Sequence, residues 1–399
     1  MSIQTTDMPF SGPLHHRLLL RTWRYLQQAA IVGIAVALVV WFGLTVRYAL
    51  AQKGIQFSFG YLWNSAGINL SEGVVLAFEG LRPFVEPFSS TDINAQALLA
   101  GLGNTLKVAL FAILLSTVFG TMVGIGRLST NWLVRNLSFG LVECVRNTPL
   151  LIQIVFWYFA VVLRFPPADA ASNWFGGLIA SRSGVFLPGL AVSNAASLVS
   201  WGLLVCGFGA AFVALFAGRR AVKAALCTAS AAAVIGSVIV GFPLAFDLPV
   251  ATRFGANGGT VLTPEMTAIL LAIVVNSSAY VAEIVRGAID ALPKGQWEAS
   301  AALGLSRSHT LRDIILPQVF RVVLPSFANR YISLTKDTSL GIAIGYPDLF
   351  NVSGTVSNQT GRNLEGVIIV MLTYLVLSWI ISACMNFVNA RANAQGGTR

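Results

Sequence analysis

The amino-acid sequence predicts an all-α polytopic membrane protein with about eight transmembrane helices. Three observations predict this fold class: the scarcity of charge, the length of the apolar stretches and the uneven placement of basic residues. Of the 399 residues, 55% are apolar and 11% are charged, whereas an ordinary soluble protein has about 25% charged residues. So little charge cannot cover a water-facing surface, which argues against a soluble enzyme and against a disordered chain.

Eight segments are apolar and long enough, or nearly so, to cross the hydrocarbon core of a bilayer, which takes about 20 helical residues. The third, sixth and seventh segments contain or adjoin charged side chains, and the others contain no charged residue. The first is too long for the apolar region of a signal peptide and no cleavage site follows it, so we expect it to persist as a helix. In chain order the predicted spans are 25–46, 108–126 (extended by 98–107), 137–163, 196–217, 224–246, 264–282, 324–346 and 366–390.

The spans divide the chain into segments with different expected roles. The outer segment 47–97 is rich in aromatic residues and is expected to form short interfacial helices, while the Gly- and Ser-rich outer segment 164–195 is expected to be a loop. The predicted organisation is a cytoplasmic tail 1–24, a helix 25–46, an outer segment 47–97, a first bundle part 98–163, an outer loop 164–195, two helices in 196–246, a second bundle part 264–390 with an inner loop 287–323, and a cytoplasmic tail 391–399.

The orientation follows from the Lys and Arg residues, because cytoplasmic loops of membrane proteins are enriched in them. With the N-terminus inside, the inner segments hold 15 of the 26 Lys and Arg residues, the outer segments hold 7, and the rest lie within spans. We therefore expect both termini in the cytoplasm. The net charge of +10 is then mainly a sign of topology, and nucleic-acid binding is not expected.

The sequence shows no pattern for catalysis, metal binding or nucleotide binding. Neither the four cysteines nor the three histidines have the spacing of a metal site, and the cysteines lie in apolar stretches, where Cys packs as a small apolar side chain. The GxxxxGK[ST] phosphate-binding loop is also absent from the sequence. We therefore expect that the chain is not an enzyme and that it binds no metal and no cofactor, ATP included.

The inner loop 287–323 has the pattern of a helix, a turn and a second helix. Glu298 lies in the first turn of the first helix, where the helix dipole favours an anion. Gly304 suits the left-handed position that ends a helix, one of the serines after it can cap the second helix, and Pro317 is expected to stop or bend that helix. The pattern is also compatible with a helix lying on the membrane, whereas DNA binding is disfavoured because spans tether the loop at both ends.

This loop resembles a known signature. The run Glu298-Ala299-Ser300, followed by Gly304 and Ile314-x-Leu316-Pro317, resembles the EAA signature of permease subunits of bacterial ABC importers. Every spacing matches, and the one departure is Ser300 in place of the second Ala. In that family the segment is the coupling helix, which docks in a groove of the ATP-hydrolysing subunit. The resemblance implies that these residues couple the chain to an ATPase.

Further stretches are similar to the polar amino-acid uptake permeases within that family: residues 103–106, 142–151, 279–296 and 333–340. The similarity covers about half of the chain and implies a type I permease core of five helices. The span 25–46 and the two in 196–246 are then additional. A chain of this length with eight spans most resembles the general L-amino acid permeases and their glutamate/glutamine/aspartate relatives.

The resemblance implies a set of partners and a location. ATP and Mg would be bound by separate ATPase subunits, a second homologous permease would complete the pathway, and a periplasmic amino-acid-binding protein would deliver an L-amino acid. The chain would lie in the lipid bilayer of the inner membrane of a Gram-negative bacterium. The residues leave one alternative open, a self-sufficient secondary amino-acid transporter or channel, which explains the spans and the intramembrane charges but not the EAA signature.

Polar residues in the third span mark a candidate substrate pathway. Glu143 and Arg146 share one helix face, and we expect them to pair because an unpaired charge inside a membrane is costly. They either contact the zwitterionic head of an amino acid or form a structural ion pair beside Pro149. The dipeptide Thr148-Pro149 indicates a discontinuous helix, a common device for building a site in mid-membrane.

The sixth and seventh spans carry the remaining candidate residues. Asn276 and Tyr280 lie at helical spacing and either line the pathway or hold helices together. Glu283 and Arg286 lie three residues apart at the inner end of the sixth span, where we expect a gate or a structural salt bridge. The adjacent charges of the seventh span are assigned to the same class of gate or structural residues: Lys336 and Asp337.

Overall fold

The structure is a computed structural model of the chain that describes residues 14–52, 57–79, 82–167, 170–171, 173–174, 177–192, 197–216, 220–242, 244–252 and 255–394. Most of the predicted N-terminal tail and the end of the C-terminal tail lie outside the described residues. The chain forms two compact units, Met1–Tyr61 and Leu62–Arg399.

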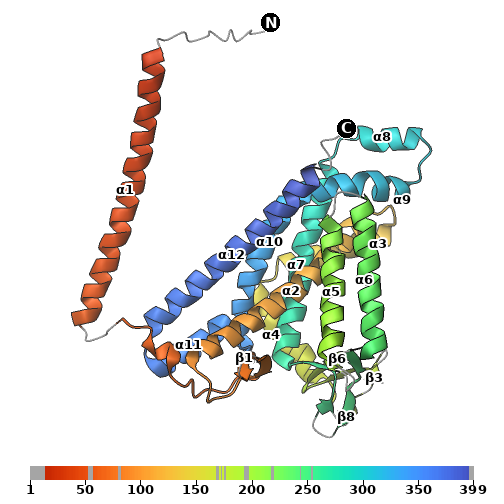
Figure 1. Cartoon of the computed structure of the whole chain (residues 1–399). Coiled ribbons are helices and arrows are strands. Elements are labelled where there is room, and N and C mark those ends of the chain that lie inside the picture. The colour runs from red at the N-terminus through yellow and green to blue at the C-terminus, as the bar shows by residue number, and fades with distance from the viewer. Residues whose placement is uncertain are drawn as a thin grey trace. The chain divides into compact units, whose positions relative to one another are not determined.

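The first unit is dominated by one long helix, α1 (Leu14–Gln52; Figure 1). Its stretch Tyr25–Ala49 is apolar enough to cross a membrane, and nothing in its most apolar part is buried inside the protein. The predicted span 25–46 lies within this stretch. Because an apolar helix without protein cover needs lipid or another protein around it, α1 has the properties of a membrane anchor.

The second unit is built around two helices, α2 (Asn94–Gly126) and α7 (Pro264–Asp290), which pack along each other. Glycine allows their close approach: a Cβ placed on Gly120 would lie 2.5 Å from the Cβ of Val281, and Gly124 is equally tight against α7. Small residues at such contacts are typical of membrane helix pairs, which associate through close packing.

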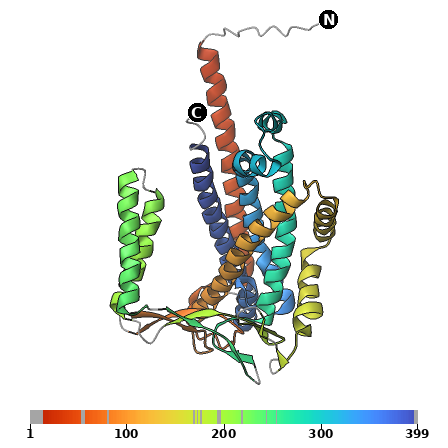
Figure 2. The same ribbon diagram turned by 90° about the vertical axis from the view of Figure 1, so that its right-hand side faces the viewer.

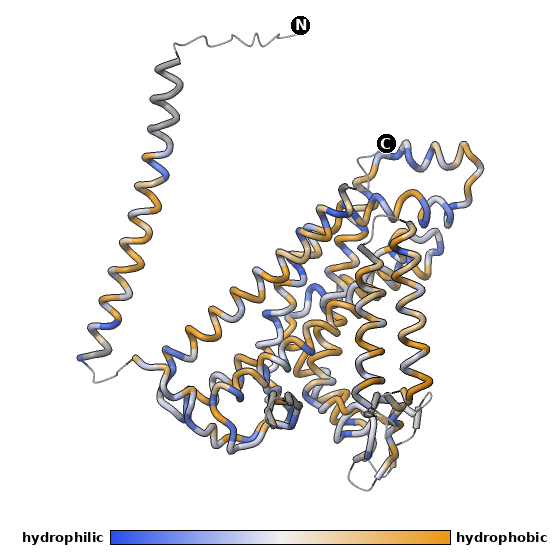
Figure 3. Tube along the Cα trace, in the orientation of Figure 1, coloured by the Kyte–Doolittle hydropathy of each residue, from blue (hydrophilic) through white to orange (hydrophobic). Residues whose placement is uncertain are grey.

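Five more helices complete this bundle, and Figure 3 shows apolar residues along most of their length. The core between them combines apolar side chains, with Val108, Ile154, Met266, Ile269 and Leu334 among the least exposed, and buried polar ones such as Asn104, Ser277 and Thr335. The additional helices are α3 (Trp132–Arg146), α4 (Leu150–Phe156), α10 (Leu316–Asp337), α11 (Leu349–Thr360) and α12 (Asn363–Ala394).

Within the described residues, five helices are long and apolar enough to cross a membrane, and the bent pair α3–α4 makes a possible sixth. The predicted count of eight is not reached by this criterion. The fourth predicted span forms α5 (Leu198–Phe216), whose apolar part is short, and the seventh forms α10, which contains four charged residues. Both segments are helical, as predicted, and the exact number of crossings stays a prediction.

The helices α5 and α6 (Arg220–Gly241) form a hairpin whose contacts are mainly with each other. Figure 2 shows the two lying side by side along their length. A Cβ on Gly207 would come within 2.9 Å of the Val234 side chain, and the Ser237 hydroxyl donates a hydrogen bond of 3.0 Å to the Ser200 carbonyl oxygen. The pair is therefore held together mainly by contacts between its own two helices.

The predicted outer segment 47–97 differs from the expectation of interfacial helices. It contains one 3-10 turn, Gly60–Trp63, and an antiparallel hairpin of β1 (Val74–Glu79) and β2 (Arg82–Pro87) in which Val74 pairs with Pro87. The run of Val, Leu, Ala and Phe in β1 suits a strand, because β-branched and aromatic residues favour extended backbone. The aromatic residues on which the expectation rested lie in and just before the 3-10 turn, whereas the strands follow later in the segment.

The predicted loop 164–195 also contains strands, which form sheets with residues after α6. One sheet has the order β10-β5-β4-β3, and two ribbons pair β6 with β7 and β8 with β9. Short strands joined by Gly explain the Gly-rich composition that suggested a loop. The strands are β3 (Asn173–Trp174), β4 (Leu178–Ser181), β5 (Gly184–Leu187), β6 (Gly189–Val192), β7 (Leu244–Asp247), β8 (Val250–Thr252), β9 (Gly255–Asn257) and β10 (Thr260–Leu262).

The third predicted span is broken, as its Thr-Pro dipeptide indicates. The helices α3 and α4 meet at an angle of 102° across the break before Leu150. Proline supplies no N–H for the helix ladder, and side chains satisfy the carbonyl groups left free. Gln153 Nε2 donates hydrogen bonds of 2.9 Å to the carbonyl oxygens of Val145 and Thr148, and the Thr148 hydroxyl donates to the Cys144 carbonyl oxygen at 2.8 Å.

The α2–α7 contact generates a test of the packing. Replacing Gly120 by Ala forces the new methyl group against Val281 and should lower stability by about 1–3 kcal/mol, the usual cost of overpacking. Gly103→Ala, on the same helix with nothing within 4 Å of a Cβ, should be neutral or slightly stabilising because Ala is the better helix former. Thermal unfolding of the purified variants in detergent measures both, and equal stability of the two would contradict the close packing.

Candidate functional site

The loop 287–323, called the coupling loop below, leaves α7 and returns into α10. It forms α8 (Gly295–Ala302), then α9 (Arg307–His309) and a π turn, Thr310–Ile315. Glu298 lies in the first turn of α8, and Gly304 has φ +71°, so both have the predicted positions. The helix-turn-helix pattern of this loop is confirmed.

Two details of the coupling loop refine the prediction. The hydroxyl of Ser306 accepts a hydrogen bond from the His309 backbone N–H at 3.3 Å, which makes Ser306 the capping residue. Pro317 lies in the first turn of α10 and does not stop the preceding helix. The reason is that proline is tolerated where a helix begins, because the first N–H groups have no partner within the helix.

One face of the coupling loop is exposed. Glu298, Ala299 and Gly304 are exposed, and the Leu303 side chain between them is 76% exposed. By contrast Ser300 is buried, and its hydroxyl donates a hydrogen bond of 2.7 Å to the Gln296 carbonyl oxygen. A serine at this position therefore fits the close packing that the signature's small residues require.

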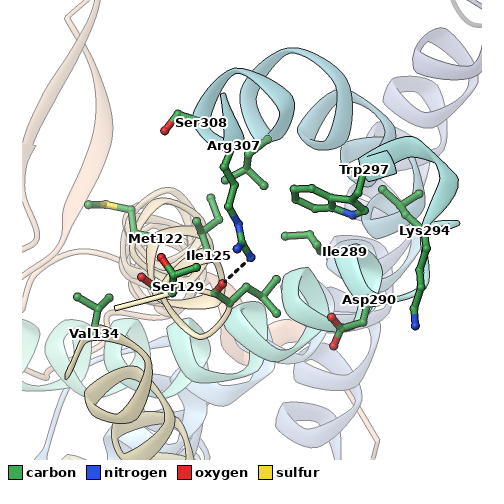
Figure 4. A pocket seen from close by; sticks show the side chains of 15 residues that line it. Met122, Ile125, Ser129, Val134, Ile289, Asp290, Lys294, Trp297, Arg307 and Ser308 are labelled. Atoms are coloured by element: carbon green, nitrogen blue, oxygen red, sulfur yellow. Dashed lines mark hydrogen bonds between the residues drawn. The ribbon is translucent and has the colours of Figure 1, made fainter. Parts of the chain in front are cut away.

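A cavity of about 670 Å³ lies between the coupling loop and the adjoining ends of α2, α3 and α7 (Figure 4). The Arg307 guanidinium lies over the Trp297 ring, 5.9 Å from its centroid, and donates a hydrogen bond of 3.5 Å to the Leu128 carbonyl oxygen. These contacts connect both halves of the coupling loop to the turn between α2 and α3. The exposed face of the loop is therefore supported by the bundle behind it.

Glu283 is the centre of a charge cluster beside the coupling loop, formed by Arg127, Arg146, Glu283, Arg286 and Asp290. Its carboxylate pairs with Arg127, with Arg286 at 2.5 Å and with Arg146 at 3.9 Å. Arg286 also contacts Asp290 at 2.5 Å. The predicted Glu283–Arg286 pair is therefore present, within a larger network that joins α7 to α3 and to the end of α2.

The predicted Glu143–Arg146 pair does not form: Arg146 takes a partner on another helix, and Glu143 takes one at the end of its own helix. Arg146 pairs with Glu283, and the Glu143 carboxylate accepts a hydrogen bond of 3.4 Å from the Asn147 side chain. The i,i+3 spacing permits a pair within one helix, but it does not require one, and the Arg146 guanidinium lies instead within 3.9 Å of a carboxylate on the neighbouring helix α7.

A second cavity, of about 330 Å³, lies at the break between α3 and α4 and is called the membrane cavity below. Four of the five predicted pathway residues line it, and Glu143 does not. Arg330, which the sequence did not single out, lines it together with Asp337. The full lining is Arg146, Asn147, Thr148, Pro149, Leu150, Asn276, Tyr280, Arg330, Asp337 and Leu340.

Arg330 is the most connected residue of the membrane cavity. One of its terminal nitrogens, Nη2, donates to Asn276 Oδ1 at 3.0 Å and to Ser277 Oγ at 2.7 Å, and lies 3.5 Å from Asp337 Oδ2. Its guanidinium lies 4.5 Å from the centroid of the Tyr280 ring, and that of Arg146 lies 5.5 Å from the same ring. The buried Nε of Arg330 has no hydrogen-bond partner among the described residues.

The cavity thus presents two guanidinium groups, one carboxylate, two side-chain amides and an aromatic ring within a small volume. Cations and a carboxylate side by side are complementary to a zwitterion, and a charge that is half desolvated binds an opposite charge more strongly than in water. Lys336 is exposed and does not line the cavity. Tyr280 and Arg330 lie 50 residues apart in the sequence, on different helices. The sequence could have indicated a role for Arg330 only through its position as a charged residue within a predicted span.

Comparison with known proteins gives matches over most of the chain. Residues 116–394 match the family described as binding-protein-dependent transport system inner membrane component. The general L-amino acid transport system permease protein of Rhizobium johnstonii is 36% identical over 374 residues, which cover 91% of this chain and 90% of that protein. The glutamate/glutamine/aspartate/asparagine transport system permease protein of Rhodobacter capsulatus is 33% identical over 401 residues, covering 91% and 92%.

Among solved structures, the chain is similar to one described as the crystal structure of an amino acid ABC transporter with histidines. The TM-score is 0.45 and the sequence identity is 22%, with 74% of this chain and 94% of that chain covered.

Proposed function

The chain belongs to the family of binding-protein-dependent transport system inner membrane components, and from this membership we propose that it is the transmembrane subunit of an ATP-driven importer of L-amino acids. The names of its relatives, a general L-amino acid permease and a glutamate/glutamine/aspartate/asparagine permease, support the substrate class. The observation that carries the proposal furthest is the membrane cavity, whose charges match an amino-acid zwitterion.

The residues of the membrane cavity have distinct proposed roles. Arg330 and Arg146 bind the substrate carboxylate, because guanidinium groups recognise carboxylates through charge-assisted hydrogen bonds. Asp337 faces the α-ammonium group, and Tyr280 packs between the two guanidinium groups, where cation–π contact holds them in place. Asn276 holds Arg330 in this orientation through its side-chain oxygen. Thr148, at the helix break, adds a hydroxyl to the same cavity.

The coupling loop is the proposed docking site for the ATPase subunits. Its exposed residues Glu298, Ala299 and Leu303 form the contact face, and Gly304 gives the loop its sharp turn. The remaining residues of the signature, Ile314, Leu316 and Pro317, join the loop to α10. ATP and Mg are bound by the ATPase, which matches the lack of a phosphate-binding loop in this sequence.

Other proposed partners follow from the family. A second homologous permease completes the pathway, a periplasmic binding protein delivers the amino acid, and the complex lies in the inner membrane of a Gram-negative bacterium with both termini of this chain in the cytoplasm. The transport mechanism is alternating access: closure of the ATPase dimer moves the coupling loop, and the bundle opens toward the periplasm.

The helix α7 connects the two sites of this mechanism. It is continuous from Pro264 to Asp290 and carries Asn276 and Tyr280 of the membrane cavity before it enters the coupling loop. Arg146 belongs both to the cavity and to the charge cluster around Glu283. A displacement of the coupling loop therefore reaches the cavity through one helix and one shared arginine, which makes the charge cluster the proposed inner gate.

The role of Arg330 in substrate binding gives a direct test. Arg330→Lys keeps the charge but loses the planar fork, and hydrogen bonds to charged groups contribute about 1.5–3 kcal/mol. The variant should therefore raise the KM for uptake roughly 10- to 100-fold while ATP hydrolysis by the complex continues. Arg135→Lys, at an exposed position on α3 outside both the membrane cavity and the coupling loop, is the matched control. An unchanged KM for Arg330→Lys would contradict its role in substrate binding.

The coupling loop gives a second test. A β-branched residue in the left-handed conformation of Gly304 costs about 1–2 kcal/mol, so Gly304→Val should distort the loop and reduce both ATPase docking and uptake about tenfold. Gly295→Val is the control, since Gly295 is exposed in the same loop without a positive φ. Co-purification of the ATPase with the membrane-inserted variants measures docking, and equal recovery with both variants would argue against this site.

Reconstitution in liposomes distinguishes the proposed ATP-driven importer from the alternative function, a secondary transporter or channel. The chain alone in liposomes should show no uptake of labelled amino acids driven by an ion gradient, whereas the complex with its ATPase, second permease and binding protein should take them up when ATP is supplied. Uptake by the chain alone, driven by a gradient and without an ATPase, would support the alternative.

A further inference from the structure

Glu72 lies outside the part of the chain that matches the family, yet its side chain contacts three elements of the bundle. It belongs to the segment between α1 and α2, ahead of residue 116 where the family match begins. Its side chain is only 10% exposed. The carboxylate accepts hydrogen bonds from Lys107 Nζ at 3.1 Å, from Thr263 Oγ1 at 2.7 Å and from the Tyr346 hydroxyl at 3.2 Å.

The three donors come from distant parts of the sequence. Lys107 lies on α2, and Thr263 is the N-cap of α7, where its hydroxyl also accepts a hydrogen bond from the Met266 backbone N–H at 3.1 Å. Tyr346 is fully buried between the 3-10 turn Thr338–Ile344 and α11. We call this group of four side chains the Glu72 joint. It lies at the end of α7 opposite the coupling loop.

The backbone around Glu72 is fitted to α2 as well. Asn104 Nδ2 donates hydrogen bonds of 3.0 Å to the carbonyl oxygens of Glu72 and Pro347. The next residue, Gly73, has φ +147°, and a Cβ there would lie 3.1 Å from the Ala100 Cβ. The segment therefore approaches α2 so closely that a glycine is required, and the carboxylate is held in place by main chain as well as by side chains.

We infer that Glu72 is a positioning residue for transport. It joins α2 at Lys107, the N-terminal end of α7 and the segment 345–348 between the 3-10 turn and α11, called the Tyr346 linker, so that they move as one body. This inference rests on the proposed function. The packing at Gly120 and Gly124 joins α2 to α7 in the half nearer the coupling loop, and the Glu72 joint joins them at the other end. With both contacts in place, a displacement of the coupling loop rotates the pair.

Without the Glu72 joint, the same displacement of the coupling loop changes the position of α7 relative to α2. The far end of α7 tilts against α2, and the Tyr346 linker no longer follows. All four side chains belong to one chain, so nothing in the joint has to break when two permease subunits separate. The joint therefore transmits movement and is not itself a gate.

The test uses the complete importer, reconstituted with its ATPase, second permease and binding protein. Glu72→Gln removes the charge that balances Lys107 and weakens the joint. The matched control is Glu86→Gln in β2, a carboxylate in the same segment that takes part in no ion pair among the described residues. We expect amino acid taken up per ATP hydrolysed to fall about 5-fold or more in Glu72→Gln, with ATP hydrolysis and thermal stability kept and Glu86→Gln unchanged.

Two results overturn the inference. The first is an unchanged ratio of uptake to ATP hydrolysis in Glu72→Gln. The second is a parallel loss of uptake, hydrolysis and thermal stability, which indicates a role in folding alone. If Glu72→Gln is not inserted, Tyr346→Phe decides, because it removes one hydroxyl from the joint and should lower the same ratio by a smaller factor; an unchanged ratio there also overturns the inference. Failure of the proposed function would appear separately, as no ATP-driven uptake by the wild-type complex.

Discussion

Polar groups inside a bilayer need partners from the protein itself, because lipid tails offer none. The break between α3 and α4 exists on this condition: Gln153 occupies two of the carbonyl groups that Pro149 leaves free. The break opens the membrane cavity, in which Arg330 is held by Asn276, Ser277 and Asp337. The same constraint explains why Glu283 collects several guanidinium groups rather than one. In the proposed site and in the proposed gate alike, the protein itself supplies the partners that polar and charged groups need within a bilayer.

The helix α7 connects the membrane cavity, the charge cluster around Glu283 and the coupling loop. Along α7, the N-cap Thr263 touches Glu72, Asn276 and Tyr280 contact Arg330, Glu283 anchors the charge cluster, and the helix then enters the coupling loop. Its packing on α2 at Gly120 and Gly124 brings the two helices close together. In the proposed mechanism a displacement from the ATPase enters at the coupling loop, so it would meet these contacts in the reverse order, with Glu283 first and Thr263 last.

Local features of the sequence predicted the helices, the break at Thr148-Pro149 and the left-handed Gly304, because each depends on residues close together in the chain. Contacts between distant residues were not predictable in this way. Spacing suggested Glu143 as the partner of Arg146, but the partner is Glu283, 137 positions away. Arg330 and Glu72 carry no local signature, since their importance comes from donors and acceptors on other helices. The outer strands were missed because aromatic and glycine-rich stretches fit several structures.

The charge cluster around Glu283 has a consequence for the electric field at the inner end of α7. Three guanidinium groups, from Arg127, Arg146 and Arg286, face two carboxylates, from Glu283 and Asp290, which leaves an excess of one positive charge. Such an excess attracts anions over a Debye length of about 10 Å at 0.1 M salt. In the proposed function, a substrate carboxylate that leaves the membrane cavity toward this cluster would pass a region of favourable potential, and a higher ionic strength would screen that attraction.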